Sequence, residues 1–169
     1  MPHVHCRIEA DGEIILSNPA ILGYAGGALW HGDYATGDLG SLDADGFLTI
    51  YGRKKNLLIT AYGRNVSPEW PESLLMAQPE IAQAFVYGDG QASLSALLVP
   101  AQEGSDVGAA VLRANAQLPD YARITQWQNS QPFSPSNGMA TGNGRLRRDI
   151  ILSTLSKELN DGFLRPACA

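Results

Sequence analysis

The feature that most constrains the fold is a change in sequence pattern at Gly52. Before it, short strand-like runs flank the turn pair Asp11-Gly12, and a second such pair is Asp45-Gly46. Asp-Gly between strand-like runs is a strong hairpin signal, and no helical period appears in this part of the chain. Residues 1–52 are therefore predicted to form an all-β segment.

After Gly52 the pattern mixes strand and helix signals. A helix is predicted to open with Ser67 as its N-cap and to bury Trp70, Leu74 and Leu75. The other predicted elements are strands at residues 56–60, 82–87, 93–99 and 124–128, helices at 107–117, after 119 and from 145, and a loop at 131–144. Residues 53–169 are thus predicted to form a small α+β domain with a central sheet and flanking helices, which makes the chain as a whole α+β.

Composition and charge argue against several classes of protein. The 169 residues are 44% hydrophobic and 17% charged, which supports a buried core rather than disorder. The formal net charge of −5 argues against nucleic acid as the main partner, because phosphate binding needs a clustered positive surface. Cys6 and Cys168 match no metal or redox spacing, so they are interpreted as free thiols and no metal site is predicted. No apolar run reaches about 18 residues, so no transmembrane helix is predicted and a cytoplasmic location is expected.

Two polar clusters in or beside the β segment are candidate nucleotide-binding groups. Thr36-Gly37-Asp38 is read as a turn between strands, where the Asp could accept two hydrogen bonds from a ribose diol or simply cap the turn. The basic run Arg53-Lys54-Lys55 lies at the junction of the two halves. Such a cluster suits a phosphate or nucleotide ligand, and its alternative is a solvated linker.

Two further candidates lie in the second half. Gly63-Arg64 follows an apolar strand in a tight turn that a ligand could approach closely, or it is a plain turn. Arg145 follows Gly144 at the end of a Gly-rich loop, where a delivered cation could neutralise phosphate charge in a transition state. Its alternative is a basic first helical turn, although positive charge there opposes the helix dipole.

Taken together, these segments resemble the AMP-forming acyl- and aryl-CoA synthetases of the adenylate-forming superfamily. The resemblance covers nearly the whole chain and rests on four motifs in the family's order: Tyr34-Ala35-Thr36-Gly37-Asp38, Gly52-Arg53-Lys54-Lys55-Asn56, Tyr62-Gly63-Arg64-Asn65-Val66-Ser67-Pro68, and Thr141-Gly142-Asn143-Gly144-Arg145-Leu146-Arg147-Arg148. The last motif, with Asn137-Gly138 before it, is most similar to the long-chain fatty acid type. The resemblance implies a ligase that joins a carboxylate and ATP to give acyl-AMP and then forms a thioester with CoA.

The resemblance also implies roles for single residues. Asp38, with Thr36, would bind the ribose hydroxyls of ATP or AMP, and Arg53 would also contact the nucleotide. Lys55 would be the hinge about which a small C-terminal domain turns between the two half-reactions. Gly63 and its neighbour Arg64 would line the path of the CoA thiol. Mg²⁺ would accompany ATP in the parent enzyme.

The sequence departs from the family pattern at the lysine that the closing motif delivers to the ATP phosphates. Arg145 occupies that position and keeps the charge, but a planar fork replaces a compact ammonium. Arg147 or Arg148 is an alternative donor of positive charge.

The family's phosphate loop, adenine-binding segment and acyl pocket match nothing in this chain. Residues 1–52 are therefore interpreted as the last β subdomain of a large N-terminal adenylating domain, and residues 53–169 as the mobile C-terminal domain. The expected partner is that N-terminal domain, and the chain alone is predicted to be inactive.

Three functional alternatives stay open from the sequence. The acyl acceptor could be CoA or the phosphopantetheine arm of a carrier protein. The chain could instead be a non-catalytic binding module, or a subunit that docks on a separate N-terminal portion, and Arg145 in place of lysine favours that reading.

Overall fold

The computed structural model describes residues 3–19, 23, 25–27, 29 and 32–160. The chain forms two compact units, Met1–Leu57 and Leu58–Ala169, and each is described by itself. The prediction of an α+β chain is confirmed. The assignment of the first part to a larger adenylating domain stays a prediction.

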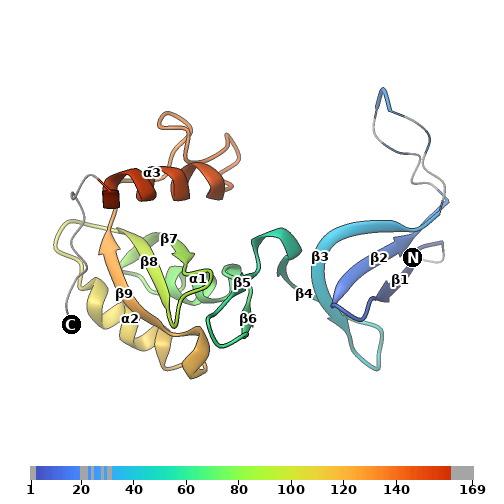
Figure 1. The fold of residues 1–169 in the computed structure, drawn as a ribbon, viewed down its shortest axis with the longest axis horizontal. Helices are drawn as coiled ribbons and strands as arrows, with labels where there is room; N and C mark the ends of the chain where they lie inside the picture. The colour runs from blue at the N-terminus through green and yellow to red at the C-terminus, as the bar shows by residue number, and fades with distance from the viewer. Residues whose placement is uncertain (1–2, 20–22, 24, 28, 30–31, 161–169) are drawn as a thin grey trace. The chain divides into compact units, whose positions relative to one another are not determined.

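The first unit is an antiparallel sheet (Figure 1). Its strands are joined in the order β1-β2-β3-β4, and a single 3-10 turn, Lys54–Asn56, follows the last strand. The strands are β1 (His5–Ile8), β2 (Glu13–Ser17), β3 (Tyr34–Leu42) and β4 (Leu48–Arg53). The first hairpin closes where Asp11-Gly12 predicts it, since the Gly12 amide donates to the Glu9 carbonyl.

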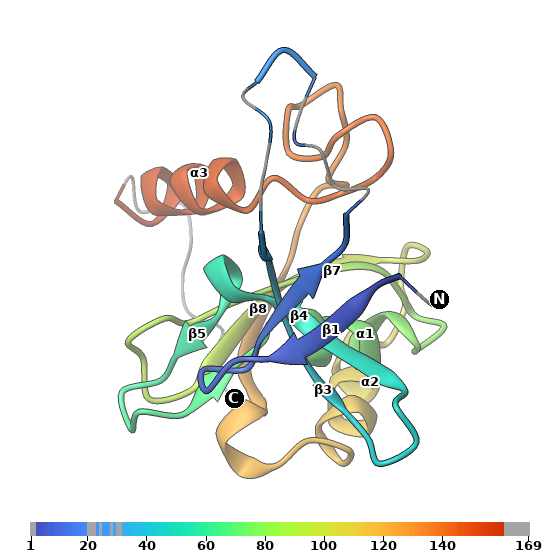
Figure 2. The same ribbon diagram turned by 90° about the vertical axis from the view of Figure 1, so that its right-hand side faces the viewer.

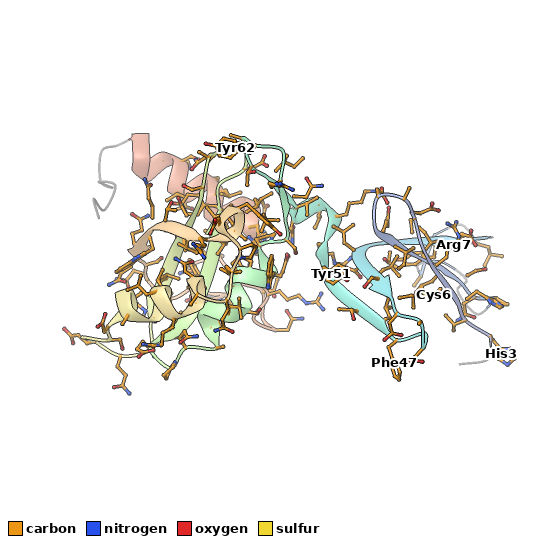
Figure 3. All side chains as sticks on the ribbon, turned by 90° about the horizontal axis from the view of Figure 1, so that it is seen from below. His3, Cys6, Arg7, Phe47, Tyr51 and Tyr62 are labelled. Carbon is orange, nitrogen blue, oxygen red and sulfur yellow. The ribbon has the colours of Figure 1, made fainter. Side chains whose placement is uncertain are left out.

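The hydrophobic core of this unit is small. Among its described residues, the buried apolar side chains are Ile14, Ile15 and Leu39. The β3–β4 hairpin instead presents Phe47 and Tyr51 to solvent, with 71% and 51% of each residue exposed (Figure 3). A sheet with so few buried side chains gains little from the hydrophobic effect, so its own stability is limited.

The second unit has a two-stranded and a three-stranded sheet with three α-helices (Figure 1). In the larger sheet β8 pairs antiparallel with β7 and parallel with β9. The strands are β5 (Leu58–Ile59), β6 (Asn65–Val66), β7 (Ile81–Tyr87), β8 (Leu94–Pro100) and β9 (Ile124–Asn129). The helices are α1 (Glu69–Met76), α2 (Val107–Asn115) and α3 (Arg148–Asn160), with a 3-10 turn at Asp120–Ala122.

The three-stranded sheet is covered on both faces. Alternate side chains of β7 point to opposite sides, so Ala84 and Val86 meet α1 and α2 while Phe85 meets α3. Figures 1 and 2 show α3 on one side of the sheet and α2 on the other. Because β8 is central and covered on both faces, its run Leu94–Val99 is buried throughout, which explains its continuous apolar sequence.

Two predictions about α1 are wrong. The helix is capped at Pro68 with no side-chain cap, and the Ser67 hydroxyl donates to the Glu69 carboxylate instead. Trp70 is 38% exposed, because the buried side of the helix carries Pro71, Glu72 and Leu75. Leu75 is buried as predicted and Leu74 packs, partly buried, against the same core, so the prediction is wrong for Trp70 alone.

Three predicted elements are shorter than expected. The strand at 56–60 reduces to the two residues of β5, and the helix after residue 119 is a single 3-10 turn. α3 begins at Arg148 rather than Arg145, because the Arg145 amide bonds to the Thr141 side chain and the Arg147 amide bonds to the Met139 carbonyl. These bonds hold the residues before Arg148 in a non-helical turn.

Candidate functional site

The Thr-Gly-Asp motif is a bulge within a strand, so the prediction of a turn between strands is wrong. Glu13 and Ile15 on β2 face Leu39 and Ala35 on β3, so three residues of β3 occupy the space opposite one residue of β2. Gly37 adopts φ +72°, a left-handed conformation that favours glycine. The bulge therefore turns the Thr36-Gly37-Asp38 segment away from regular pairing.

Three hydrogen bonds define the shape of this bulge. The Thr36 hydroxyl donates to the Ile14 carbonyl at 2.8 Å and accepts from the Asp38 amide at 3.0 Å. The Gly37 amide donates to Oε1 of Glu13 at 3.0 Å. Thr36 thus shapes the bulge, and the carboxylate of Asp38 is left to bind other groups.

Arg53 lies directly opposite Asp38 on the neighbouring strand. Its Nε is 2.8 Å from Oδ1 of Asp38, and its Nη1 donates to the Thr36 carbonyl at 3.0 Å. The Asp38 side chain is 27% exposed and that of Arg53 is 48% exposed, so both can be reached from solvent. The structure brings Thr36, Asp38 and Arg53 together in one polar cluster.

Lys54 and Lys55 differ sharply although they are neighbours. The Lys54 ammonium donates to Oδ2 of Asp11 at 2.6 Å and to Oε2 of Glu13 at 2.7 Å. Hydrogen bonding from Lys54 lowers the pKa of both carboxyl groups. The predicted hinge residue, Lys55, is exposed and its side chain forms no hydrogen bond or ion pair with the described part of the chain.

The Gly63 turn joins β5 to β6 in the second unit. The Gly63 amide donates to the Thr60 carbonyl, and the hydroxyl of the buried Thr60 accepts from the Arg64 amide at 3.1 Å. A Cβ built on Gly63 would meet no atom within 4 Å, so the turn faces open space. Its neighbour Tyr62 is 76% exposed (Figure 3).

Arg64 leaves this turn and stacks on an aromatic ring. Its guanidinium carbon is 5.7 Å from the ring centroid of Tyr121, which belongs to the 3-10 turn before β9. This distance is within the range of a cation–π interaction. The stacking holds a positive charge beside the Gly63 turn.

The closing motif is a tight, hydrogen-bonded turn. The Thr141 amide donates to the Arg145 carbonyl at 2.8 Å, and the Arg145 amide donates to the Thr141 hydroxyl at 3.0 Å. A bridge between Ala140 and Leu146 extends the pairing. Arg145 is exposed, and its guanidinium has no hydrogen-bond or ion-pair partner among the described residues.

Arg148 has a structural role. It forms an ion pair with Oε1 of Glu72, donates to the Val86 carbonyl and lies 5.0 Å from the ring centroid of Phe85. Only 17% of the Arg148 side chain and 7% of the Glu72 side chain are exposed. Burial raises the pKa of Glu72 to about 7, although the Arg148 charge opposes that shift. Of the two alternatives to Arg145, the exposed Arg147 is therefore the one left available.

Sequence reasoning gave no individual role to four residues of this arrangement. They are Glu13, Lys54, Tyr121 and Glu72, each of which supports a residue that the motifs do identify. Glu13 follows the turn pair Asp11-Gly12, and Lys54 belongs to the basic run Arg53-Lys54-Lys55, but neither was assigned a contact of its own. The motif singles out Lys55 but does not reveal the ion pairs of Lys54, because these are made with carboxylates more than 40 positions away in the chain.

The described residues contain no group of three His, Cys, Asp or Glu side chains that could hold a metal ion. Across the same described residues, no helix combines the length and apolar character that a membrane crossing requires. Cys6 is half-buried and forms no disulfide with a described residue, and Cys168 lies outside the described residues.

Among known proteins, the chain is similar in sequence to two fatty-acid–CoA ligases. The chain is 42% identical over 105 residues to the long-chain-fatty-acid–CoA ligase FadD15 of Mycobacterium tuberculosis, covering 58% of this chain and 18% of that protein. It is 32% identical over 166 residues to the putative fatty-acid–CoA ligase fadD11 of the same species, covering 88% of this chain and 27% of that protein. The chain therefore spans roughly a quarter or less of the length of these relatives.

The fold matches a solved adenylating domain. The A domain of carboxylic acid reductase from Segniliparus rugosus, solved with AMP and a co-purified carboxylic acid, superposes with a TM-score of 0.76 at 18% identity. That match covers 95% of this chain and 32% of the other, and at this identity it supports the fold alone. The model of the AMP-binding enzyme C-terminal domain matches residues 55–164. The predicted resemblance is confirmed, and the chain belongs to the family of AMP-binding enzyme C-terminal domains.

Proposed function

We propose that this chain supplies the ribose-binding bulge, the hinge and the mobile C-terminal domain of an AMP-forming acyl-CoA synthetase. The reaction joins a carboxylate to the α-phosphate of ATP with release of pyrophosphate, and a thiol then displaces AMP to form a thioester. The observation that carries the proposal is the cluster of Thr36, Asp38 and Arg53. It offers a partly exposed carboxylate and guanidinium on a bulge whose backbone is fixed by hydrogen bonds.

In the first half-reaction, Asp38 would accept hydrogen bonds from the 2′ and 3′ hydroxyls of the nucleotide. Arg53 fixes one carboxylate oxygen of Asp38 through Nε, and its remaining nitrogen could contact the nucleotide. Arg145 would bring positive charge to the phosphates. It is the exposed last residue of a turn that hydrogen bonds to Thr141 hold in place. Mg²⁺ would arrive with ATP and be held by its phosphates.

In the second half-reaction, the C-terminal domain would turn about Lys55 and bring the Gly63 turn to the acyl-adenylate. The open space beside Gly63 suits the narrow thiol arm of CoA. Arg64, held by Tyr121, would offer its charge to a phosphate of the same molecule. We expect this chemistry in the cytoplasm, where ATP and CoA are the available substrates.

The test is acid-dependent exchange of labelled pyrophosphate into ATP, with a panel of fatty and aromatic acids. The purified chain is assayed alone and with the upstream portion of a ligase such as FadD15. No exchange by the chain alone, with exchange restored by the upstream portion, supports the proposal. Robust exchange by the chain alone would mean that a complete adenylation site lies within it and would overturn the proposal.

Arg145 favours a second candidate, a non-catalytic module that binds a separate adenylating portion. An arginine at a phosphate site has a larger, planar head group than lysine and a different hydrogen-bond geometry. The substitution Arg145→Lys distinguishes the two functions. If the chain is catalytic with arginine, both forms support exchange in the reconstituted assay. If only the lysine form does, the natural chain is non-catalytic.

A further inference from the structure

We propose that Glu13 and Lys54 are positioning residues for nucleotide binding, because they hold the backbone of the Thr-Gly-Asp bulge from the side opposite Arg53. The inference rests on the proposed function, since it assigns a role at the same ribose site. Neither residue belongs to the Thr-Gly-Asp motif itself, and the resemblance assigns no role to either.

Glu13 links two segments with its two carboxylate oxygens. Oε1 accepts from the Gly37 amide at 3.0 Å, and Oε2 accepts from the Lys54 ammonium at 2.7 Å. The Glu13 side chain is only 13% exposed. Its two partners, Gly37 and Lys54, come from separate segments of the first unit. Hydrogen bonds to an ionised group are stronger than neutral ones, so this carboxylate is a firm acceptor for the Gly37 amide.

Lys54 keeps the Glu13 carboxylate in place. It forms a second ion pair with Asp11 at 2.6 Å, and Oδ1 of Asp11 accepts from the Glu13 amide. Three charges therefore form a network that links the β1–β2 hairpin to the 3-10 turn after β4. A network of this kind restrains its members more than a single exposed pair does.

The two consecutive basic residues thus act on opposite parts of one bulge. Arg53 binds the Asp38 carboxylate and the Thr36 carbonyl, whereas Lys54 acts through Glu13 on the Gly37 amide between them. Gly37 lies in the bulge, outside the pairing register of β2 and β3, and its amide bonds to the Glu13 side chain instead. Loss of that acceptor would let the Asp38 carboxylate shift relative to the ribose.

The first measurement uses the purified chain and the Gly37 amide resonance. In the natural chain this resonance should follow the ionisation of Glu13 as pH is lowered through its depressed pKa. The shift should vanish in Glu13→Gln. A Gly37 resonance that is insensitive to this substitution would overturn the inference, whatever the chain's function.

The second measurement is the KM for ATP in the reconstituted exchange assay. Glu13→Gln and Lys54→Met should each raise the KM about tenfold, the loss expected for a weakened charged contact, with kcat changed by less than about twofold. Lys54→Arg should restore the KM, because a guanidinium can pair with both carboxylates. Arg7→Gln, which removes ion pairs to Glu9 and Asp33 elsewhere in the same sheet, is the matched control and should change neither constant.

The outcomes separate this inference from the proposed function. If the natural chain never supports exchange, the proposed function fails and this role fails with it. If the natural chain is active and Glu13→Gln keeps the same KM, only the positioning role fails. A fall in kcat and in melting temperature without a change in KM would also overturn it, because that pattern reports general stability. Lys54→Met, which keeps the Glu13 carboxylate but removes the ammonium that restrains it, serves if Glu13→Gln does not fold.

Discussion

Glu72 is an acid in an apolar setting, and its environment has a measurable consequence. Its carboxylate contacts Arg148 and the Val86 amide between α1, β7 and α3, with 7% of the side chain exposed. Burial raises its pKa to about 7 from an ordinary value of 4.5. Between these values the folded state holds a proton that the unfolded state has released, so stability falls as pH rises through this range.

We expect the free energy of unfolding to decrease by about 2 kcal/mol between pH 5 and pH 7.5 on account of this one group. Glu72→Gln removes the titrating carboxyl and should flatten that part of the profile. Urea unfolding of both forms at the two pH values measures the difference. If the free energy of unfolding changes with pH by the same amount in both proteins, Glu72 has an ordinary pKa in the folded state.

Gly40 lies where β3 packs closely against β4, with no room for a side chain. A Cβ at this position would lie 2.4 Å from the Thr49 carbonyl oxygen and 2.8 Å from Cδ1 of Ile14. The first contact is with backbone, so it cannot be relieved by a side-chain rotation. Gly40→Ala should destabilise the first unit by about 2 kcal/mol or more, through overpacking.

The measurement for Gly40→Ala is amide hydrogen exchange resolved by residue. Strands β1 to β4 should lose protection while β7, β8 and β9 keep theirs. Gly142→Ala is the control, because a Cβ there meets nothing within 4 Å and the backbone is not left-handed. Uniform loss of protection over both units would contradict the expectation.

Individual contacts are the part of the site that sequence reasoning could not predict. The motifs identify Asp38 and Arg53 as functional candidates, but the direct pairing of the two follows from the register of β3 and β4. Trp70 was expected to share the buried face of its helix with Leu75, yet it is 38% exposed and α1 turns Glu72 inward to meet Arg148. A buried ion pair between residues 76 positions apart leaves no periodic signal in the sequence.

At the scale of elements, the closing turn before α3 has a defined structure of its own. The Thr141 hydroxyl accepts from the Arg145 amide and donates to Oδ1 of Asn143. The composition of residues 131–144 predicts a loop, and hydrogen bonds within the turn make it ordered. Arg145 is therefore presented from a fixed backbone.

Thr141→Val removes the hydroxyl and keeps the shape of the side chain. The Arg145 amide should exchange with solvent about fivefold faster, since an exposed hydrogen bond contributes about 1 kcal/mol. Ser153→Ala, which removes an exposed hydroxyl that bonds to the Ile150 carbonyl in α3, is the control and should leave the Arg145 amide unchanged. Unchanged exchange in Thr141→Val would mean that backbone bonds alone hold the turn.

The type of an element could be predicted where an apolar pattern extends along it. The prediction was wrong where individual hydrogen bonds or strand pairing determine the local structure. β7, β8 and α2 lie within one or two residues of their predicted bounds, because each is marked along its whole length by an apolar run or a recurring apolar face. The Thr36-Gly37-Asp38 bulge has the composition of a turn, and only pairing on both sides shows that the strand continues through it. A sequence read locally cannot detect such pairing.

At the scale of the whole molecule, the two units differ in the core that each can bury. The described part of the first unit buries Ile14, Ile15 and Leu39, whereas the second unit buries apolar side chains on both faces of a sheet. Fold class follows from sequence patterns, but these do not show which apolar or aromatic side chains stay exposed, as Phe47, Ile50 and Tyr51 do.

We expect residues 58–169 to fold alone and residues 1–57 not to. The second unit has two buried clusters, and the first relies on a thin sheet and exposed ion pairs, which contribute little. Each segment is expressed separately and compared with the whole chain by amide-resonance dispersion and thermal melting. Residues 58–169 should melt cooperatively, within a few degrees of the main transition of the whole chain. If residues 1–57 show a dispersed spectrum and a cooperative melt of their own, the sheet and its Lys54 network suffice for folding, and core size is not what limits this unit.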